Sequence, residues 1–440
     1  MTQRRLLERL ALHRPELRAW ALYDWANSAF FTTIVTAVFP LYYRDVLAAG
    51  RTDVLERYTV LTAASMFAIA VCGPLLGAIA DTSARKKPLL ALFLALGAGA
   101  TAAMFFLERG DWNLGGWLFA LANVGVAGSF VFYDGLLPSI AKPDELDRVS
   151  TAGYALGYLG GGTLLLLDVL LITHPQWLGV APDSTLPARL SFVSVAVWWV
   201  LFSIPLFRRV REPERTLESD EQPGTSSVRA ALVRLAETVR EIPRYRSAFL
   251  LLLAMLIYGD GINTIIRMAT LYGADIGLEG KALIVPVMLV QFVGVPCAFA
   301  FGWLASKIGA KRAIMLGLFV YMLVCVLAWR MTTVAEFYLV AGGVGLVQGG
   351  CQALSRSLFA SMIPAHKAGE YFGLFGILER FSSVLGPAAF ALAIQWTGSS
   401  RAGILPLIAF FGVGALLLSR IDVEAGRRAA QQAESELRRG

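Results

Sequence analysis

Residues 20–43 read WALYDWANSAFFTTIVTAVFPLYY, an apolar stretch that carries one carboxylate. A helix needs about 20 mostly apolar residues to cross the roughly 30 Å hydrocarbon core of a bilayer, so this stretch is long enough to span a membrane. Asp24, Ser28, Thr32 and Thr36 recur at intervals of four, which places them on one helical face. We expect this face to line a polar cavity.

The composition indicates a polytopic membrane protein. The chain has 440 residues, of which 56% are hydrophobic and 16% charged, against about 25% charged residues in an average soluble domain. The net charge of +7 comes mostly from Lys and Arg in short connections, which favours retention of these loops in the cytoplasm over binding of nucleic acid. The four cysteines lie in apolar runs, so we expect neither disulfides nor a metal site.

Twelve apolar stretches predict an all-α protein with twelve transmembrane helices. The first six are residues 20–43, 58–80, 88–107, 112–141, 149–173 and 190–207. The last six are residues 247–273, 282–306, 313–329, 334–363, 371–396 and 404–419. They predict one six-helix bundle over residues 1–207, a linker over 208–246, a second bundle over 247–420 and a tail over 421–440.

Basic residues gather in every second connection. Examples are Arg208 and Arg209 after the sixth stretch and Lys311 and Arg312 after the eighth. The positive-inside rule then places both termini and the linker in the cytoplasm. We expect the protein in the cell (inner) membrane, with no removable signal peptide.

The two halves repeat each other. GAIADTSARKK begins at residue 77 after the second stretch, and GWLASKIGAKR begins at residue 302 after the eighth. Asp24 and Asn27 in the first stretch have counterparts in Asp260 and Asn263 in the seventh. Two parallel halves related by an axis along the membrane normal fit this pattern.

The first copy of the repeated loop predicts a gating element. Gly77 lets two helices approach closely, and Asp81 can accept from a helix N-terminus or pair with a cation. Arg85 and Lys86 are suited to anchor the loop at the lipid headgroups. An ordinary positive loop would explain the basic residues alone, but recurrence at corresponding places in both halves favours a shared structural device.

Ionisable residues inside transmembrane stretches are candidates for function, since each costs about 2.5–3.5 kcal/mol at the bilayer centre. Asp24 either lines the cavity or meets headgroup water near the helix start. Asp134 either handles a proton or solute, or forms a gate contact. Asp260 and Arg267, with Asn263 between them, can flank a ligand. These alternatives stay open at the level of sequence.

Arg356 ends a polar row formed with Gln348 and Gln352 at intervals of four. A guanidinium there suits an anionic group such as a carboxylate on the solute. The competing interpretation is a structural ion pair with a carboxylate on a neighbouring helix.

The twelve stretches, the two halves and the repeated loop resemble the major facilitator superfamily. The loop departs from the usual pattern, because Ala84 stands where a glycine is usual and Ser306 replaces the acid in the second copy. The acid-mediated clamp that the resemblance implies is therefore expected to be stronger in the first half.

Within that superfamily, YDWANSAF at residues 23–30 resembles the signature of the vacuolar-effluxer branch, which includes fungal autophagy-related amino-acid effluxers. Further matches are Tyr133-Asp134, GYLGG at residues 157–161, QALSRS at 352–357 and LGP at 385–387. The resemblance implies an amino acid or similar zwitterion as cargo, exported from its compartment. It also implies a basic residue at Arg380, where relatives usually carry one.

The sequence predicts a secondary active transporter that rocks its halves around a site at the membrane midplane. No GxxxxGK[ST] motif is present, so an ion gradient or the solute's own gradient is the expected energy source. Asp24, then Asp134 and Asp260, are the candidates for proton coupling, with sodium as an alternative. We expect a monomer that lies in the lipid bilayer and binds a small-molecule substrate. We expect no nucleic-acid partner, no cofactor and no catalytic residue.

Other functions compete with this prediction. One is a multidrug-type exporter of hydrophobic or cationic compounds, which Arg267 and Arg356 count against for purely cationic cargo. A membrane enzyme would need a convergent cluster of His, Cys or acidic residues near one membrane face, and none is evident in the sequence. A receptor or scaffold would not need polar rows on corresponding helices of both halves.

Overall fold

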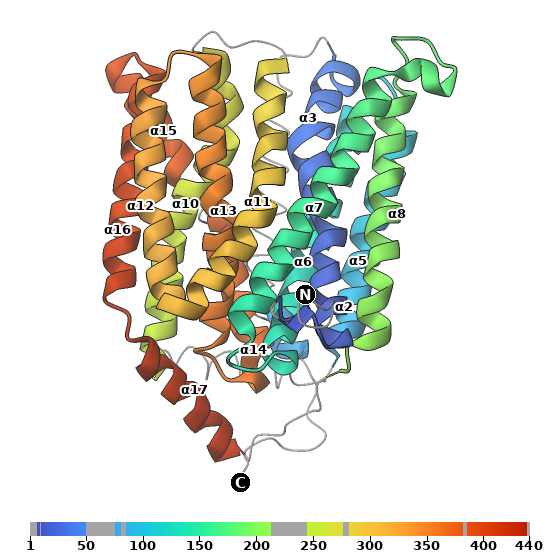
Figure 1. Ribbon diagram of the computed structural model, residues 1–440. Coiled ribbons are helices and arrows are strands. Elements are labelled where there is room, and N and C mark those ends of the chain that lie inside the picture. The colour runs from blue at the N-terminus through green and yellow to red at the C-terminus, as the bar shows by residue number, and fades with distance from the viewer. Residues whose placement is uncertain are drawn as a thin grey trace.

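The computed structural model describes residues 7–8, 10–49, 75–80, 85–212, 244–275, 281–381 and 385–437. Regular structure in these residues is entirely helical, and the long helices run side by side (Figure 1). Nine helices among the described residues are long and apolar enough to cross a membrane. The predicted all-helical membrane architecture is confirmed for this part of the chain.

The N half comprises the helices before the linker. They are α2 (Pro15–Ala29), η1 (Phe30–Ala37), α3 (Phe39–Tyr42), η2 (Tyr43–Leu47), α5 (Lys86–Ala103), η3 (Met104–Phe106), α6 (Trp112–Ile140), α7 (Leu146–Thr173), η4 (Pro175–Leu178) and α8 (Leu186–Arg209). The second predicted span, residues 58–80, lies mostly outside the described residues, and its last residues, 75–80, are helical.

The C half comprises the helices after the linker. They are α10 (Arg246–Asp275), α11 (Lys281–Ile308), α12 (Ala310–Arg330), α13 (Val334–Ala360), η5 (Ala365–Lys367), α14 (Ala368–Phe381), α15 (Leu385–Thr397), η6 (Ser400–Ile404), α16 (Leu405–Ser419) and the tail helix α17 (Val423–Leu437). The span predicted over residues 371–396 is helical in α14 and in α15, and residues 382–384 between them lie outside the described residues.

The first span is not a uniform α-helix. It begins at Pro15, five residues before the predicted start, because proline is well suited to the first turn of a helix. Its middle, η1, is a π-helix in which the Val38 amide donates to the Thr33 carbonyl over 2.7 Å. Pro40 lacks an N–H and its ring clashes with the carbonyl four residues earlier, so widened turns before it are expected.

The halves meet along α7, which packs against both α11 and α13, and at a second place where α6 packs against α14. Tail helix α17 lies at the end of the molecule where α2 begins (Figure 1). It is held there by the Arg244–Glu436 ion pair at 2.6 Å and by the Glu434 carboxylate, which accepts from the Ala365 amide over 3.1 Å. The predicted polar tail is thus an ordered helix over most of its length.

Close packing within the N half depends on two glycines that face each other. A Cβ at Gly125 of α6 would overlap the backbone of Gly97 on α5 and lie 2.8 Å from the Phe93 carbonyl oxygen. Backbone atoms cannot move aside as a flexible side chain can. The α5–α6 contact therefore requires glycine here.

We predict that Gly125→Ala lowers the thermal unfolding temperature of the purified protein by several degrees. Overpacking a tight contact costs about 1–3 kcal/mol. Gly99→Ala on the same helix pair is the control, because a Cβ there meets no atom within 4 Å. Equal unfolding temperatures for the two variants would contradict this account of the contact.

Candidate functional site

Arg356 of α13 binds carboxylates from two helices of the other half. Its Nη2 donates to Oδ2 of Asp24 on α2 over 3.0 Å, and its Nη1 donates to Oδ1 of Asp134 on α6 over 3.2 Å. Its Nε donates to the Ser150 hydroxyl of α7 over 2.9 Å. We call these four residues the ion cluster. It connects three N-half helices to one C-half helix.

The ion cluster is almost sealed from solvent. Asp24 is 5% exposed, Asp134 7% and Arg356 2%. The carbon at the centre of the guanidinium lies 4.7 Å from the Trp20 ring centroid and 4.6 Å from that of Tyr154, at distances typical of cation–π contacts. Two carboxylates therefore share one guanidinium in a desolvated site, which gives these charged groups a formal sum of −1.

Helix α7 comes close enough to complete the cluster because of its small residues. The Ser150 carbonyl accepts from Arg356 Nη2 over 3.1 Å, and its hydroxyl donates to the Ala353 carbonyl of α13 over 2.7 Å. A Cβ on Gly153 would contact the Asp24 carboxylate and lie 3.1 Å from Arg356 Nη2. A larger residue at position 153 would displace the ion pair.

The polar row on the first span packs against α7, which corrects our expectation that it lines a cavity. A Cβ at Gly157 would lie 2.6 Å from the Ser28 hydroxyl, and the Thr32 hydroxyl donates to the Gly161 carbonyl over 3.1 Å. Glycines of α7 therefore oppose Asp24, Ser28 and Thr32 at matching intervals of four. Thr36 is exposed and bonds within its own helix, to the Phe31 carbonyl.

A second contact between the halves involves the predicted gating loop. A Cβ at Gly77 would overlap the backbone of Gly369 on α14, and one at Gly135 of α6 would lie 3.3 Å from the Gly369 Cα. Buried Lys86 donates from Nζ to the Gly135 carbonyl over 3.1 Å. Arg85 is exposed, and Asp81 lies outside the described residues, so the acid-mediated clamp is a prediction on which the structure does not bear.

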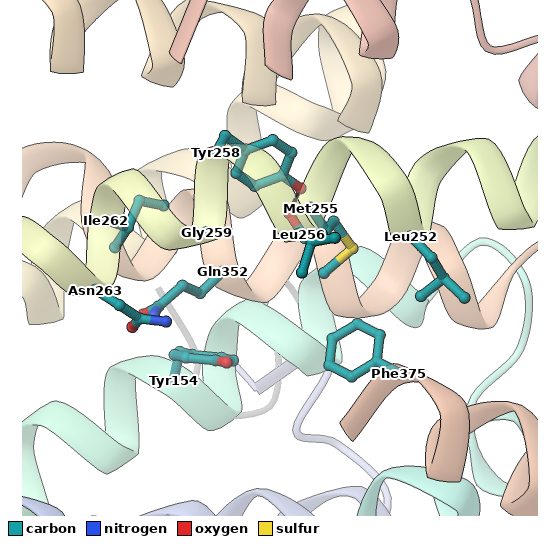
Figure 2. Close-up of a pocket in the computed structure, with 11 residues that line it drawn as sticks. Tyr154, Leu252, Met255, Leu256, Tyr258, Gly259, Ile262, Asn263, Gln352 and Phe375 are labelled. Atoms are coloured by element: carbon teal, nitrogen blue, oxygen red, sulfur yellow. Dashed lines mark hydrogen bonds between the residues drawn. The ribbon is translucent and has the colours of Figure 1, made fainter. Parts of the chain in front are cut away.

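Asn263 and Gln352 come together at a cavity of about 40 Å³ between the halves. Figure 2 shows the two amide side chains close to each other above the ring of Tyr154, with Met255 and Phe375 further along. Tyr258 also lines this cavity, and its hydroxyl shares a 2.5 Å hydrogen bond with Ser355. Amide groups at one end and apolar side chains at the other could orient a small solute.

Two further predicted site residues, Asp260 and Asn27, belong neither to the ion cluster nor to the described lining of this cavity. Asp260 is fully buried where α10 meets α15, and a Cβ at Gly386 would lie 2.7 Å from its Oδ1. Asn27 is 1% exposed on α2. Arg267 and Arg380 lie in α10 and α14, and their side chains are outside the described residues. Asp24 and its repeat counterpart Asp260 thus occupy different environments.

Ser150 and Tyr154 are residues of the candidate site that the sequence analysis does not identify. They stand one turn apart on α7, and both contact Arg356. Ser150 and Tyr154 are four residues apart, and Gly153 and Gly157 on the same helix are too. This pattern of small and polar residues is the feature of the sequence that indicates a close helix contact here. Neither residue is ionised near neutral pH, so a search for charged groups within membrane spans passes over them.

The sequence matches the family described as vacuole effluxer Atg22 like over residues 57–431. It is 35% identical over 426 residues to the MFS-type transporter YxiO of Bacillus subtilis (strain 168), covering 94% of this chain and 96% of that protein. Autophagy-related protein 22 of Cryptococcus neoformans var. neoformans serotype D (strain B-3501A) is 27% identical over 302 residues, which cover 64% of this chain and 54% of the fungal protein.

Solved structures establish the fold. The transporter FucP in its outward conformation aligns with a TM-score of 0.65 at 13% identity, covering 93% of this chain and 98% of that one. A bacterial homologue of the iron transporter ferroportin, in an outward-facing state, gives the same TM-score and identity, with 92% and 98% covered. The predicted major facilitator fold is confirmed. This chain is an integral membrane transporter, not an enzyme, and it belongs to the Atg22-like vacuole effluxer family of the major facilitator superfamily.

Proposed function

We propose that this protein exports an amino acid or similar small zwitterion across the cell membrane, driven by protons and working as a monomer with both termini in the cytoplasm. The observation that carries the proposal is the ion cluster, which joins the halves through Arg356, Asp24 and Asp134. A transporter that alternates its access must break and remake contacts between its halves. This cluster is a charged contact of that kind.

The cluster supplies a reason for proton coupling. With both carboxylates ionised, its charges sum to −1 in a site from which water is excluded. A proton on either carboxylate would bring this sum to zero. Separation of the halves would hydrate Asp24 and Asp134 and release the proton. Opening and closing of the contact thereby changes the number of bound protons.

The proposed cargo and direction of transport rest on the family and on the cavity near Asn263 and Gln352. The family is described as effluxers, which supports export. The amides of Asn263 and Gln352 offer donors and acceptors to a polar headgroup, and Met255 and Phe375 offer contacts to an apolar side chain. The apolar end of this cavity also favours the second candidate, an exporter of hydrophobic compounds.

We predict that Arg356→Gln lowers the free energy of unfolding by about 3–5 kcal/mol, because it leaves two buried carboxylates without a cation. Asp24→Asn should cost less, since Asp134 still balances Arg356. The triple variant Asp24→Asn, Asp134→Asn, Arg356→Gln should regain stability relative to Arg356→Gln. Thermal unfolding in detergent measures this order. A triple variant no more stable than Arg356→Gln would show that charge balance is not the cause.

We predict that Asp24→Asn abolishes the dependence of flux on an imposed pH gradient in proteoliposomes loaded with a radiolabelled mixture of the standard amino acids. The control is Asp45→Asn, since Asp45 is an exposed carboxylate that forms an ion pair with its neighbour Arg44. That variant should retain the wild-type response. The coupling assignment would be disproved if flux through the wild type did not depend on the pH gradient, or if flux through Asp24→Asn still depended on it.

We predict that at least one amino acid raises the unfolding temperature of the purified protein in a screen against amino acids, short peptides and cationic drugs. A ligand that binds the folded state stabilises it by mass action, by about 2.7 kcal/mol at a hundredfold excess over its dissociation constant. Gln352→Leu should weaken the shift, because it removes one of the two amides. Shifts from drugs alone would favour the exporter of hydrophobic compounds.

A further inference from the structure

The cavity near Asn263 and Gln352 is contributed almost entirely by the C half. Its lining residues from α10, α13 and α14 include Met255, Tyr258 and Phe375. Of the described residues that line it, Tyr154 alone comes from the N half (Figure 2). A solute held there would meet the N half through this one ring.

The same ring lies against the ion cluster. The Tyr154 ring centroid is 4.6 Å from the central guanidinium carbon of Arg356, and Ser150, one turn earlier on α7, holds Arg356 through its hydroxyl and carbonyl. On α13, Gln352 lines the cavity one turn before Arg356. Tyr154 therefore separates the cavity from the cluster and contacts both.

The cavity is too small to hold a solute without a movement of its walls. A volume of 40 Å³ leaves room for a few water molecules only, whereas pockets for drug-sized ligands measure about 300–1,000 Å³. An incoming solute must enlarge the cavity. If the C-half wall holds its shape, the ring of Tyr154 has to move, and α7 with Ser150 moves away from Arg356.

We propose that Tyr154 is the positioning residue through which occupation of the cavity weakens the ion cluster. This inference rests on the proposed transport function, and it adds the element that connects the solute to the contact between the halves. The aromatic ring is the required feature, because it fills the space and faces the guanidinium.

A larger side chain placed in the cavity by mutation can stand in for the solute, so the inference can be tested without a known solute. Met255→Trp places a larger side chain in the cavity from the C half. We expect it to raise amide hydrogen exchange of the backbone around Ser150 and Arg356 by roughly 2- to 30-fold, the range that loss of a cation–π contact produces. Leu253→Trp is the matched control, since Leu253 is 45% exposed on the outer face of the same helix. It should leave exchange there unchanged.

Tyr154 is then varied in the Met255→Trp background. Each Tyr154 variant is compared with and without Met255→Trp. With Tyr154→Phe, Met255→Trp should still raise amide hydrogen exchange around Ser150 and Arg356. With Tyr154→Ala it should not, because the added side chain occupies the space that the ring has left. A rise that persists with Tyr154→Ala, or that Tyr154→Phe eliminates, overturns the proposal. Met255→Phe is the smaller substitute if Met255→Trp does not fold, and it carries the same expectations.

These measurements involve neither a pH gradient nor a cargo. Failure of proton-driven flux in the wild type would therefore remove the coupling assignment while the exchange result still decides the role of Tyr154. Conversely, pH-driven flux together with unchanged exchange in Met255→Trp would retain the proposed function and refute this role.

Discussion

A guanidinium buried among membrane helices requires carboxylates close to it, because an uncompensated charge in a medium of low dielectric constant is very costly. Arg356 meets this requirement with Asp24 and Asp134, which belong to the other half of the molecule. The ion pairs therefore fix the position of one half relative to the other. Much of the packing at this end of the bundle serves to bring these three side chains together.

That packing depends on small residues. The ion pair fits because Gly153 leaves space beside Asp24, and α2 stays close to α7 because Gly157 and Gly161 face Ser28 and Thr32. Close approach of helix backbones also increases dispersion contacts, which matter in a bilayer because lipid removes the hydrophobic driving force between helices. The glycines of α7 thus provide both the stability of the helix pair and the space for the charged contact.

Most of the fold followed from hydrophobic length and repetition. Helix α6, predicted over residues 112–141, is observed as Trp112–Ile140, because an apolar run bounded by charges marks both of its ends. The internal structure of the first span, with its π-helical turns, was not predicted. These turns are a local departure from regular α-helix geometry, which a count of apolar residues does not detect.

The candidate site was predictable as a set of residues but not as an arrangement. Asp24, Asp134 and Arg356 were identified because ionisable groups are rare in membrane spans. Their mutual contact was not, because residues 24 and 356 are brought together by the packing of two halves, and helical periodicity carries no information about it. Tyr154 was missed for a related reason: its importance comes from what lies on either side of its ring.

In this arrangement of the halves, Arg356 forms ion pairs with carboxylates on neighbouring helices. Each of its three nitrogens donates to Asp24, Asp134 or Ser150, and the Trp20 and Tyr154 rings lie against the guanidinium. A carboxylate on a solute would have to displace one that the protein already supplies. Such an exchange becomes possible once the halves separate, because water then solvates the released aspartate. The structural ion pair and an anion site can therefore belong to one guanidinium at different stages of a transport cycle.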